Sequence, residues 1–442
     1  MINRTVVAKI LCSSSALVAG LWCGFSLLRP AVGHADVANW EVPREGPLPQ
    51  GARSFVVTDL QHAPVFANAG MTDQLMGHVG YGAAIAVHSP RSGRGCRAQW
   101  LQTEGGWVCG DRGMLSVRAP TQRDGIPDGD EALPWAYSFT GRDDVRAYRN
   151  ENAALTLSQD PAEFQVWERN WGFAVESVIG AGEGRVLRTR GGFYVRRRDV
   201  YRAAPTSFSG AAFRTLEGTE RGIAFGWVAL GATRRYEQPE ERGASTLLPR
   251  LSVVRVYGVH GRGRRAMARI GDSAWARADH LRWVAPEPPP ASVNVQARER
   301  WIDVDIASQT LIAYEGAEPV YATMVSTGAE RFATATGSFR VWGKYLAHTM
   351  DNTENQSLPN HFRLGDVPYV QFFDGDRGLH GVYWHDQFGT PRSHGCVNLA
   401  PNDARWLFRF TAQPLPPGWI SRATASADST LIRVRGRYAF NR

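Results

Sequence analysis

The sequence predicts a mainly β protein divided into several small domains. At 442 residues the chain is longer than one hydrophobic core usually serves. Short runs that alternate apolar and polar residues recur along most of its length, and Gly- or Asp-centred turns separate them, as is typical of antiparallel strands. Only residues 401–410 show convincing helical spacing, with Pro401 suited to the first turn and Leu407 and Phe408 on one face. We therefore expect strands throughout, with one short helix in the last domain.

The first 35 residues predict an export segment. Arg4 and Lys9 precede a mostly apolar run over residues 10–28, and residues 32–35 end in a small-x-small pattern that favours cleavage after Ala35. The same run is long enough to remain as a membrane anchor, and that alternative stays open. Cleavage is favoured because serines and a glycine weaken the run as a membrane span. Either outcome predicts a location in the periplasm or cell envelope.

The cysteines agree with export. Cys96 and Cys109 flank a predicted hairpin over residues 97–108, which places them well for a disulfide in an oxidising compartment. Beyond residue 35 this leaves Cys396 as the odd cysteine. An unpaired thiol in an exported protein needs a reason, and chemical reactivity is the one that its neighbours favour.

The composition indicates the class of partner. The formal net charge is +8, and this mild excess favours anionic polymers such as cell-wall material. The basic residues form no tight cluster of the kind that nucleic-acid binding requires, so we expect no nucleic-acid partner. Nothing in the sequence calls for a cofactor.

Residues 36–284 contain a weak threefold repeat, which predicts modules at 60–120, 143–204 and 230–284. In each, an aromatic residue follows a turn, at Trp107, Phe193 and Trp275. The spacing and the closing hairpin resemble those of bacterial SH3-like small barrels, which implies ligand or wall-peptide binding. We favour the alternative that these aromatics fill small cores, because an aromatic residue at alternate strand positions more often packs inside.

Consecutive prolines mark residues 285–298 as a semi-rigid linker. The domain that follows, residues 299–436, is predicted to be β-rich, with a loop over 348–366 and the helix at 401–410. Its predicted strands cover residues 300–306, 310–314, 319–326, 336–342, 368–373 and 430–434.

Two short motifs in this domain point to cysteine chemistry. The sequence Ser-His-Gly-Cys-Val-Asn covers residues 393–398, and a His-Gly pair begins at His380, sixteen residues before Cys396. A thiol is mostly protonated near pH 7 and needs a base to become a nucleophile. His380 can approach from a neighbouring strand. His394 is poorly placed for this role because, in an extended chain, it points alongside Cys396 rather than at it.

The residues around this pair have predicted supporting roles. The Gly381 carbonyl or the Asp386 carboxylate would orient the base. Gly395 lets the chain turn tightly, so that its amide and that of Cys396, together with His394, can bind an oxyanion. Ser393 and Asn398 would hold the loop by hydrogen bonds.

These motifs closely resemble the signature of bacterial L,D-transpeptidases of the YkuD family. Residues 326–328 (Ser-Thr-Gly) and 334–337 (Thr-Ala-Thr-Gly) resemble two further family segments, although Ala335 stands where the family usually has proline. The resemblance implies Cys396 as the nucleophile and His380 as the general base. It also implies the Gly381 carbonyl as orienter and an oxyanion loop that contains His394 and Gly395.

The resemblance further implies a substrate and a reaction. Cys396 would attack the amide before the terminal D-alanine of a peptidoglycan tetrapeptide stem, and an amine would then take the acyl group. The acceptor stays open: a second stem, giving a 3-3 cross-link, an outer-membrane protein, or water, with carboxypeptidase or endopeptidase activity. Tyr383, Trp384 and Arg392 are near enough in sequence to shape the donor pocket, with packing or surface roles as the alternative.

Two other readings compete with this one. His380, His385, His394 and Cys396 are all acceptable zinc ligands, but their spacing fits no compact zinc pattern. The second reading is a non-catalytic peptidoglycan-binding envelope protein, which the intact motif disfavours. We expect neither a metal nor a cofactor.

Overall fold

The computed structural model describes residues 53–57, 63–80, 83–110, 115–116, 132–213, 224–241, 243–352 and 361–437. The predicted export segment at 1–35 lies outside these ranges. Strands predominate, and the prediction of a mainly β chain is confirmed. Within the described residues, no helix combines the length and the hydropathy that crossing a bilayer requires.

The first module pairs its strands antiparallel in the order β7–β1–β4–β5–β6–β2–β3. Alternate residues of the strands face inward, so that Val65, Val79 and Val108 are fully buried in one small core. A disulfide of 2.06 Å joins Cys96 to Cys109 at the end of the β5–β6 hairpin. The strands are β1 (Arg53–Val57), β2 (Ala63–Phe66), β3 (Leu75–Val79), β4 (Ala84–Arg91), β5 (Trp100–Thr103), β6 (Gly106–Cys109) and β7 (Leu115–Ser116).

The second module pairs its strands in the order β14–β8–β11–β12–β13–β9–β10. It also contains helix α1 (Glu151–Thr156), which the sequence did not predict, and Asn150 caps that helix by accepting from the Ala153 N–H. The strands are β8 (Ala136–Thr140), β9 (Val145–Tyr148), β10 (Phe164–Trp167), β11 (Gly172–Ile179), β12 (Val186–Thr189), β13 (Tyr194–Arg196) and β14 (Val200–Arg202).

The third module has two small sheets, ordered β19–β16–β23 and β18–β17–β22–β21–β20. Its strands are β16 (Ala224–Val228), β17 (Arg234–Tyr236), β18 (Ser245–Leu247), β19 (Val253–Val256), β20 (Gly258–His260), β21 (Met267–Gly271), β22 (Ala274–Arg277) and β23 (Leu281–Trp283). The recurring aromatics Trp107, Phe193 and Trp275 are half-buried in their respective modules. An SH3-like fold for the three modules stays a prediction.

The C-terminal domain packs two sheets and one helix around a shared core. The first sheet has the order β15–β26–β25–β24–β33–β27, and the second has the order β32–β28–β29–β30–β31. The first contains β15 (Ala211–Ala212), β24 (Arg300–Asp305), β25 (Thr310–Glu315), β26 (Glu318–Met324), β27 (Gly337–Arg340) and β33 (Leu431–Arg435). The second contains β28 (Gly343–Asp351), β29 (Arg363–Asp374), β30 (Arg377–Gly381), β31 (Val397–Leu399) and β32 (Trp419–Ala423).

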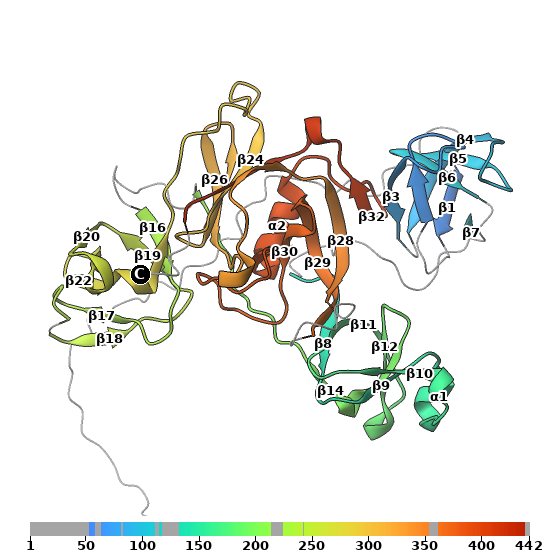
Figure 1. Cartoon of the computed structure of the whole chain (residues 1–442), viewed down its shortest axis with the longest axis horizontal. Coiled ribbons are helices and arrows are strands. Elements are labelled where there is room, and N and C mark those ends of the chain that lie inside the picture. Colours follow the sequence, from blue (N-terminus) through green and yellow to red (C-terminus); the bar gives the residue numbers. More distant parts are fainter. Residues whose placement is uncertain are drawn as a thin grey trace, which may run out of the picture. The chain divides into compact units, whose positions relative to one another are not determined.

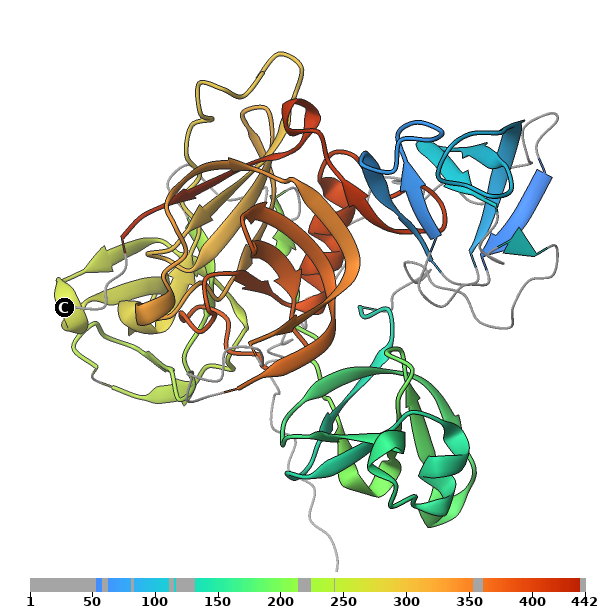
Figure 2. The same cartoon turned by 45° about the vertical axis from the view of Figure 1, so that its right-hand side comes forward.

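Helix α2 (Pro401–Phe410) follows β31 and packs against β29 and β30, as both views show (Figures 1 and 2). Its bounds are those predicted from the sequence, and Ala404, Leu407 and Phe408 face the core. The core joins them to apolar residues of both sheets, such as Ile302 and Leu379. This packing supports β30 and β31. His380 lies in β30, and Cys396 directly precedes β31.

The predicted loop over 348–366 was wrong in part. Strand β28 continues to Asp351 and β29 begins at Arg363, so the two form a longer hairpin than expected. Beyond His348 the residues of β28 are exposed or half-buried. A ribbon of two strands with little burial lacks the apolar alternation by which a strand is recognised in a sequence.

The predicted linker contacts the C-terminal domain. The Glu287 N–H donates to the Tyr314 hydroxyl, and Arg433 donates to the Pro288 carbonyl. Before the third module, Phe208 enters a core cluster of the C-terminal domain, and β15 adds to the edge of its first sheet at β26.

Candidate active site

Strand register brings the two motifs together. Strands β30 and β31 are parallel neighbours, and His380 pairs with Asn398. Cys396 lies in the bend that directly precedes β31. A backbone hydrogen bond from Gly378 of β30 reaches its thiol, which also donates to the Asp376 carbonyl over 3.9 Å. Cys396 therefore lies beside β30, the strand that carries His380.

The surroundings of His380 favour a neutral imidazole. Its ring is almost completely buried, and burial lowers the pKa of His380 to about 4. Nδ1 lies 3.1 Å from the Gly381 carbonyl oxygen, so this nitrogen carries the proton and donates it. Nε2 is then the acceptor nitrogen, as a general base requires.

The surroundings of Cys396 favour a neutral thiol. Burial of the sulfur raises the pKa of Cys396 to about 11, and a hydrogen bond from the backbone of Gly378 opposes that rise. Asp376 acts in the same direction as burial, whereas the positive charge of Arg377 lowers the pKa of the thiol. At pH 7 these shifts favour a neutral thiol and a neutral imidazole over a preformed thiolate–imidazolium pair.

The nucleophile loop needs glycine at residue 395. Gly395 has φ +117°, and a Cβ there would lie 2.8 Å from Nε of Arg377. The Gly395 N–H donates to the Ser393 hydroxyl over 3.1 Å, and that hydroxyl donates to the Cys396 carbonyl over 2.5 Å. Ser393 thus holds the loop, as predicted for its role, but it also occupies one of the amides expected to bind the oxyanion.

The segment Ser326–Gly328 braces this loop from β26. Its backbone exchanges two hydrogen bonds with Asn398 through Ser326, and the Thr327 carbonyl accepts from the Ser393 N–H over 3.0 Å. Thr334 donates its hydroxyl to the Gly395 carbonyl over 2.9 Å and accepts from the Gly328 N–H. The family resemblance drew attention to these segments, and the structure shows what they contact.

Gln309 is a supporting residue that the sequence analysis missed. Its side chain donates to the Thr327 hydroxyl over 2.6 Å and accepts from the Thr327 N–H over 2.9 Å. Gln309 follows β24 in a tight turn with φ +55°, far from either motif in the sequence. No local pattern could have pointed to it.

His394 is exposed, unlike His380. Its ring centroid lies 4.3 Å from that of Phe332 and 5.3 Å from that of Phe362. The His394 ring therefore joins an aromatic group on the surface with Phe332 and Phe362.

The three predicted donor-pocket residues have different surroundings. Tyr383 is 2% exposed, its ring stacks on Tyr137 at 4.0 Å, and its hydroxyl donates to the Gly365 carbonyl. This burial argues against substrate contact by Tyr383 and is a correction to the prediction. Trp384 is half-buried with its ring 5.9 Å from that of His380, which keeps it beside the site. Arg392 is exposed and donates to the Gln387 side chain.

Two further predictions concern His385 and Asp386. Asp386 accepts from Arg250 of the third module, and the Gly381 carbonyl, not Asp386, accepts from Nδ1 of His380. Nε2 of His385 lies 3.0 Å from the side-chain amide of Asn398. The zinc alternative finds no support in the described ranges, where no three His, Cys, Asp or Glu side chains are grouped to hold a metal ion.

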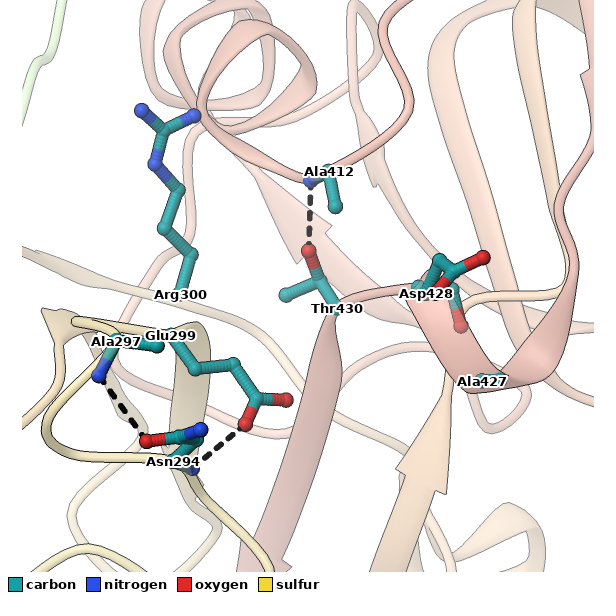
Figure 3. Close-up of a pocket in the computed structure, with 9 residues that line it drawn as sticks. Asn294, Ala297, Glu299, Arg300, Ala412, Ala427, Asp428 and Thr430 are labelled. Carbon is teal, nitrogen blue, oxygen red and sulfur yellow. Dashed lines mark hydrogen bonds between the residues drawn. The ribbon is translucent and has the colours of Figure 1, made fainter.

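A separate cavity of about 370 Å³ lies beside the start of β24 (Figure 3). Asn294 and Glu299 lie on one side of it, and on the other Thr430 accepts from the Ala412 N–H. None of its lining residues belongs to the two motifs, so this cavity is distinct from the candidate active site.

Comparisons with known proteins bear on this domain. Residues 299–420 match the family model of the L,D-transpeptidase catalytic domain, YkuD. The curated protein "Putative L,D-transpeptidase YciB" of Bacillus subtilis is 27% identical over 126 residues, 26% of this chain. The chain spans only 62% of the length of that relative.

Solved structures of the same class are similar to parts of the chain. An L,D-transpeptidase from Mycobacterium smegmatis is 17% identical, with 59% of this chain and 98% of that chain covered and a TM-score of 0.26. The catalytic domain of an Enterococcus faecium L,D-transpeptidase acylated by ertapenem is 23% identical, with 31% and 98% covered and a TM-score of 0.25.

Proposed function

We propose that this chain, whose residues 299–420 are a YkuD-family L,D-transpeptidase catalytic domain, is a peptidoglycan L,D-transpeptidase that works through Cys396. One observation carries the proposal. The pairing of β30 with β31 sets His380 against Asn398, and a backbone hydrogen bond from Gly378 of β30 reaches the thiol of Cys396, which directly precedes β31. This supports a base and a nucleophile that are near neighbours, the minimum that acyl transfer requires.

In the first step Cys396 forms an acyl-enzyme. The sulfur attacks the carbonyl carbon between the meso-diamino acid and the terminal D-alanine of a tetrapeptide stem, while Nε2 of His380 takes the thiol proton. The backbone N–H of Cys396 binds the developing oxyanion, with that of His394. The carbon–nitrogen bond then breaks, His380 returns the proton to the nitrogen, and D-alanine leaves.

In the second step an amine of another stem attacks the thioester. Its proton passes to His380, the carbon–sulfur bond breaks, and the proton returns to the sulfur. Buried His380 can exchange one proton in each direction because its neutral form predominates at pH 7. Water or an amine of an outer-membrane protein would complete the same step, giving hydrolysis or protein attachment.

The location and the substrate contacts follow from this reaction. Peptidoglycan stems are outside the cytoplasm, so we propose that the segment at 1–35 exports the catalytic domain to the periplasm or cell envelope and is cleaved or kept as an anchor. Trp384, beside the His380 ring, and Arg392, which is exposed, are the proposed contacts for the donor stem. A guanidinium suits a substrate carboxylate.

The test is mass spectrometry of the full chain without residues 1–35, incubated with a disaccharide-tetrapeptide and, separately, with ertapenem. We expect loss of D-alanine together with a cross-linked dimer, and one ertapenem adduct on the peptide that contains Cys396. The Cys396→Ser variant, with the smallest change of shape, should give neither product. D-alanine release without a dimer would replace the transferase assignment by a carboxypeptidase. No release and no adduct would overturn the proposal and favour a non-catalytic wall-binding protein.

A further inference from the structure

The segment that joins the two motifs is held from outside the catalytic domain. Residues Asp386–Gly389, here called the clamped segment, lie between His385 and the nucleophile loop. Arg250 donates to the Asp386 carbonyl over 2.9 Å and also pairs with the Asp386 carboxylate. Arg282 donates from Nε to the Gly389 carbonyl over 2.7 Å. Both arginines belong to the third module, before residue 284.

Apolar packing supports these polar contacts. Phe388 is fully buried in a core that the third module and the catalytic domain share, and its ring stacks on Phe208 at 5.8 Å. A Cβ on Gly389 would lie 2.7 Å from the Cβ of Ala229 in the third module. The two segments therefore approach as closely as glycine allows. Such a packed contact transmits small displacements because protein interiors leave few voids.

The opposite side of the clamped segment rests on the brace of the nucleophile loop. The Gly389 N–H donates to the Val325 carbonyl over 2.9 Å, and the Ser326 hydroxyl donates to the Gln387 carbonyl over 2.7 Å. Ser326 also pairs with Asn398 through its backbone. The clamped segment therefore connects the third module to the residues that position Cys396.

His385 connects the clamped segment to Asn398, the residue that pairs with His380. Its Nδ1 accepts from the Gln387 N–H over 3.2 Å, and burial lowers the pKa of His385 to about 4, so the neutral ring carries its proton on Nε2. That proton needs an acceptor, and the side-chain amide of Asn398 lies 3.0 Å away. The nitrogen of that amide faces Nε2, while the buried amide oxygen of Asn398 makes no hydrogen bond. Turning the amide over exchanges these two atoms, so that the oxygen accepts the Nε2 proton and fixes Asn398 beside His380.

We propose that Arg250 and Arg282 are positioning residues of the active site, so that the third module is a working part of the catalytic unit rather than a separate binding module. They hold the clamped segment so that His385 and Asn398 keep the base and the thiol in register. This inference rests on the transpeptidase function proposed above. Neither arginine touches substrate.

The primary test uses Arg250→Ala in the full chain without residues 1–35, because its pair with Asp386 lies at the surface and its loss should not unfold the protein. We expect kcat for D-alanine release, and the rate of acylation by ertapenem, to fall about five- to tenfold, with KM changed less than about twofold. Alkylation of Cys396 by iodoacetamide, which needs no base, should stay within about twofold of the wild type. A structural defect would instead lower the two catalytic rates and the Tm together and raise the alkylation rate, because exposure brings the pKa of the thiol back toward its ordinary value.

Arg282 and a matched control sharpen the test. Arg282→Met should cost about 30-fold in kcat, and Arg282→Lys should recover part of that loss. Arg277→Ala is the control, because this arginine of the same module pairs with Asp279 and Glu241 inside the module. Equal kcat in Arg250→Ala, Arg282→Met and the control would overturn the inference. A wild type that releases no D-alanine and takes up no ertapenem would overturn the proposed function instead.

Discussion

The base strand and the nucleophile loop of the active site are built in different ways. His380 lies in a buried strand, where register determines its position, burial favours its neutral state and one hydrogen bond to the Gly381 carbonyl orients its ring. Cys396 lies at the end of an irregular loop, where side chains from distant segments, such as Thr334 and Ser393, hold each peptide group in place. The difference teaches that the proposed base depends on packing, whereas the proposed nucleophile depends on a network of hydrogen bonds that reaches across the domain.

Replacing the base should have the largest effect. His380→Gln keeps a buried polar side chain of similar length. It removes the imidazole nitrogen that would take the thiol proton. We expect acylation of Cys396 by ertapenem to slow about 10²- to 10⁴-fold. Stopped-flow acylation rates would measure this. His394→Gln is the matched control, since its ring is exposed and packs on Phe332, and it should lose less than about tenfold. Equal losses in the two variants would contradict the assignment of the base.

The second prediction concerns the charge state of the thiol. With a pKa of about 11, Cys396 is scarcely ionised at pH 7. The rate of its alkylation by iodoacetamide should therefore rise by about tenfold per pH unit between pH 7 and pH 10. Acylation by ertapenem should stay nearly level over the same range, because His380, with a pKa of about 4, remains a neutral base throughout. An alkylation rate that is already high and flat at pH 7 would indicate a preformed ion pair instead.

The contrast between the strand that carries His380 and the loop that carries Cys396 also explains what the sequence could predict. The strand pattern located β24, β25, β33 and the helix over 401–410, because burial leaves a periodic record in the residues themselves. Nothing local marked Gln309 or the Arg250–Asp386 pair, which act through contacts 18 and 136 residues apart in the chain. Tyr383 looked like a substrate contact by its nearness to His380, yet the second module covers it through Tyr137. Proximity in sequence does not decide which face a side chain takes.

Breaking the brace of the loop should give an intermediate effect. Gly328→Ala would place a Cβ 1.9 Å from the Phe332 carbonyl oxygen, so the backbone of this segment must move. Because residues 326–328 carry the hydrogen bonds to Ser393 and Asn398, we expect acylation to slow about 10²-fold. Gly184→Ala, where the new methyl group meets nothing within 4 Å, is the control and should be silent. Equal acylation rates in both variants would show that the loop holds its shape without this brace.

The smallest expected effect on catalysis comes from the packing behind the base strand. Asp403 of α2 accepts from the Gly210 N–H and from the Tyr321 and Thr323 hydroxyls, and Ala404 beside it packs on Gly381. Asp403→Ala removes the acceptor of three buried donors and should lower the free energy of unfolding by about 3 to 5 kcal/mol. Urea denaturation measures this, with Asp272→Asn at an exposed site as the control.

The pH dependence of that stability tests the physical cause. Burial raises the pKa of Asp403 to about 6, above its ordinary 3.8, so the folded state binds the proton more tightly than the unfolded state. The contribution of Asp403 to stability should therefore be complete below about pH 3.8 and should fall as the pH rises to 6. The stability difference between the wild type and Asp403→Asn should shrink over that range and level off above it. A difference that grows with pH would mean that the ionised carboxylate, held by its three donors, is the favoured form, and that hydrogen bonding outweighs burial at this position.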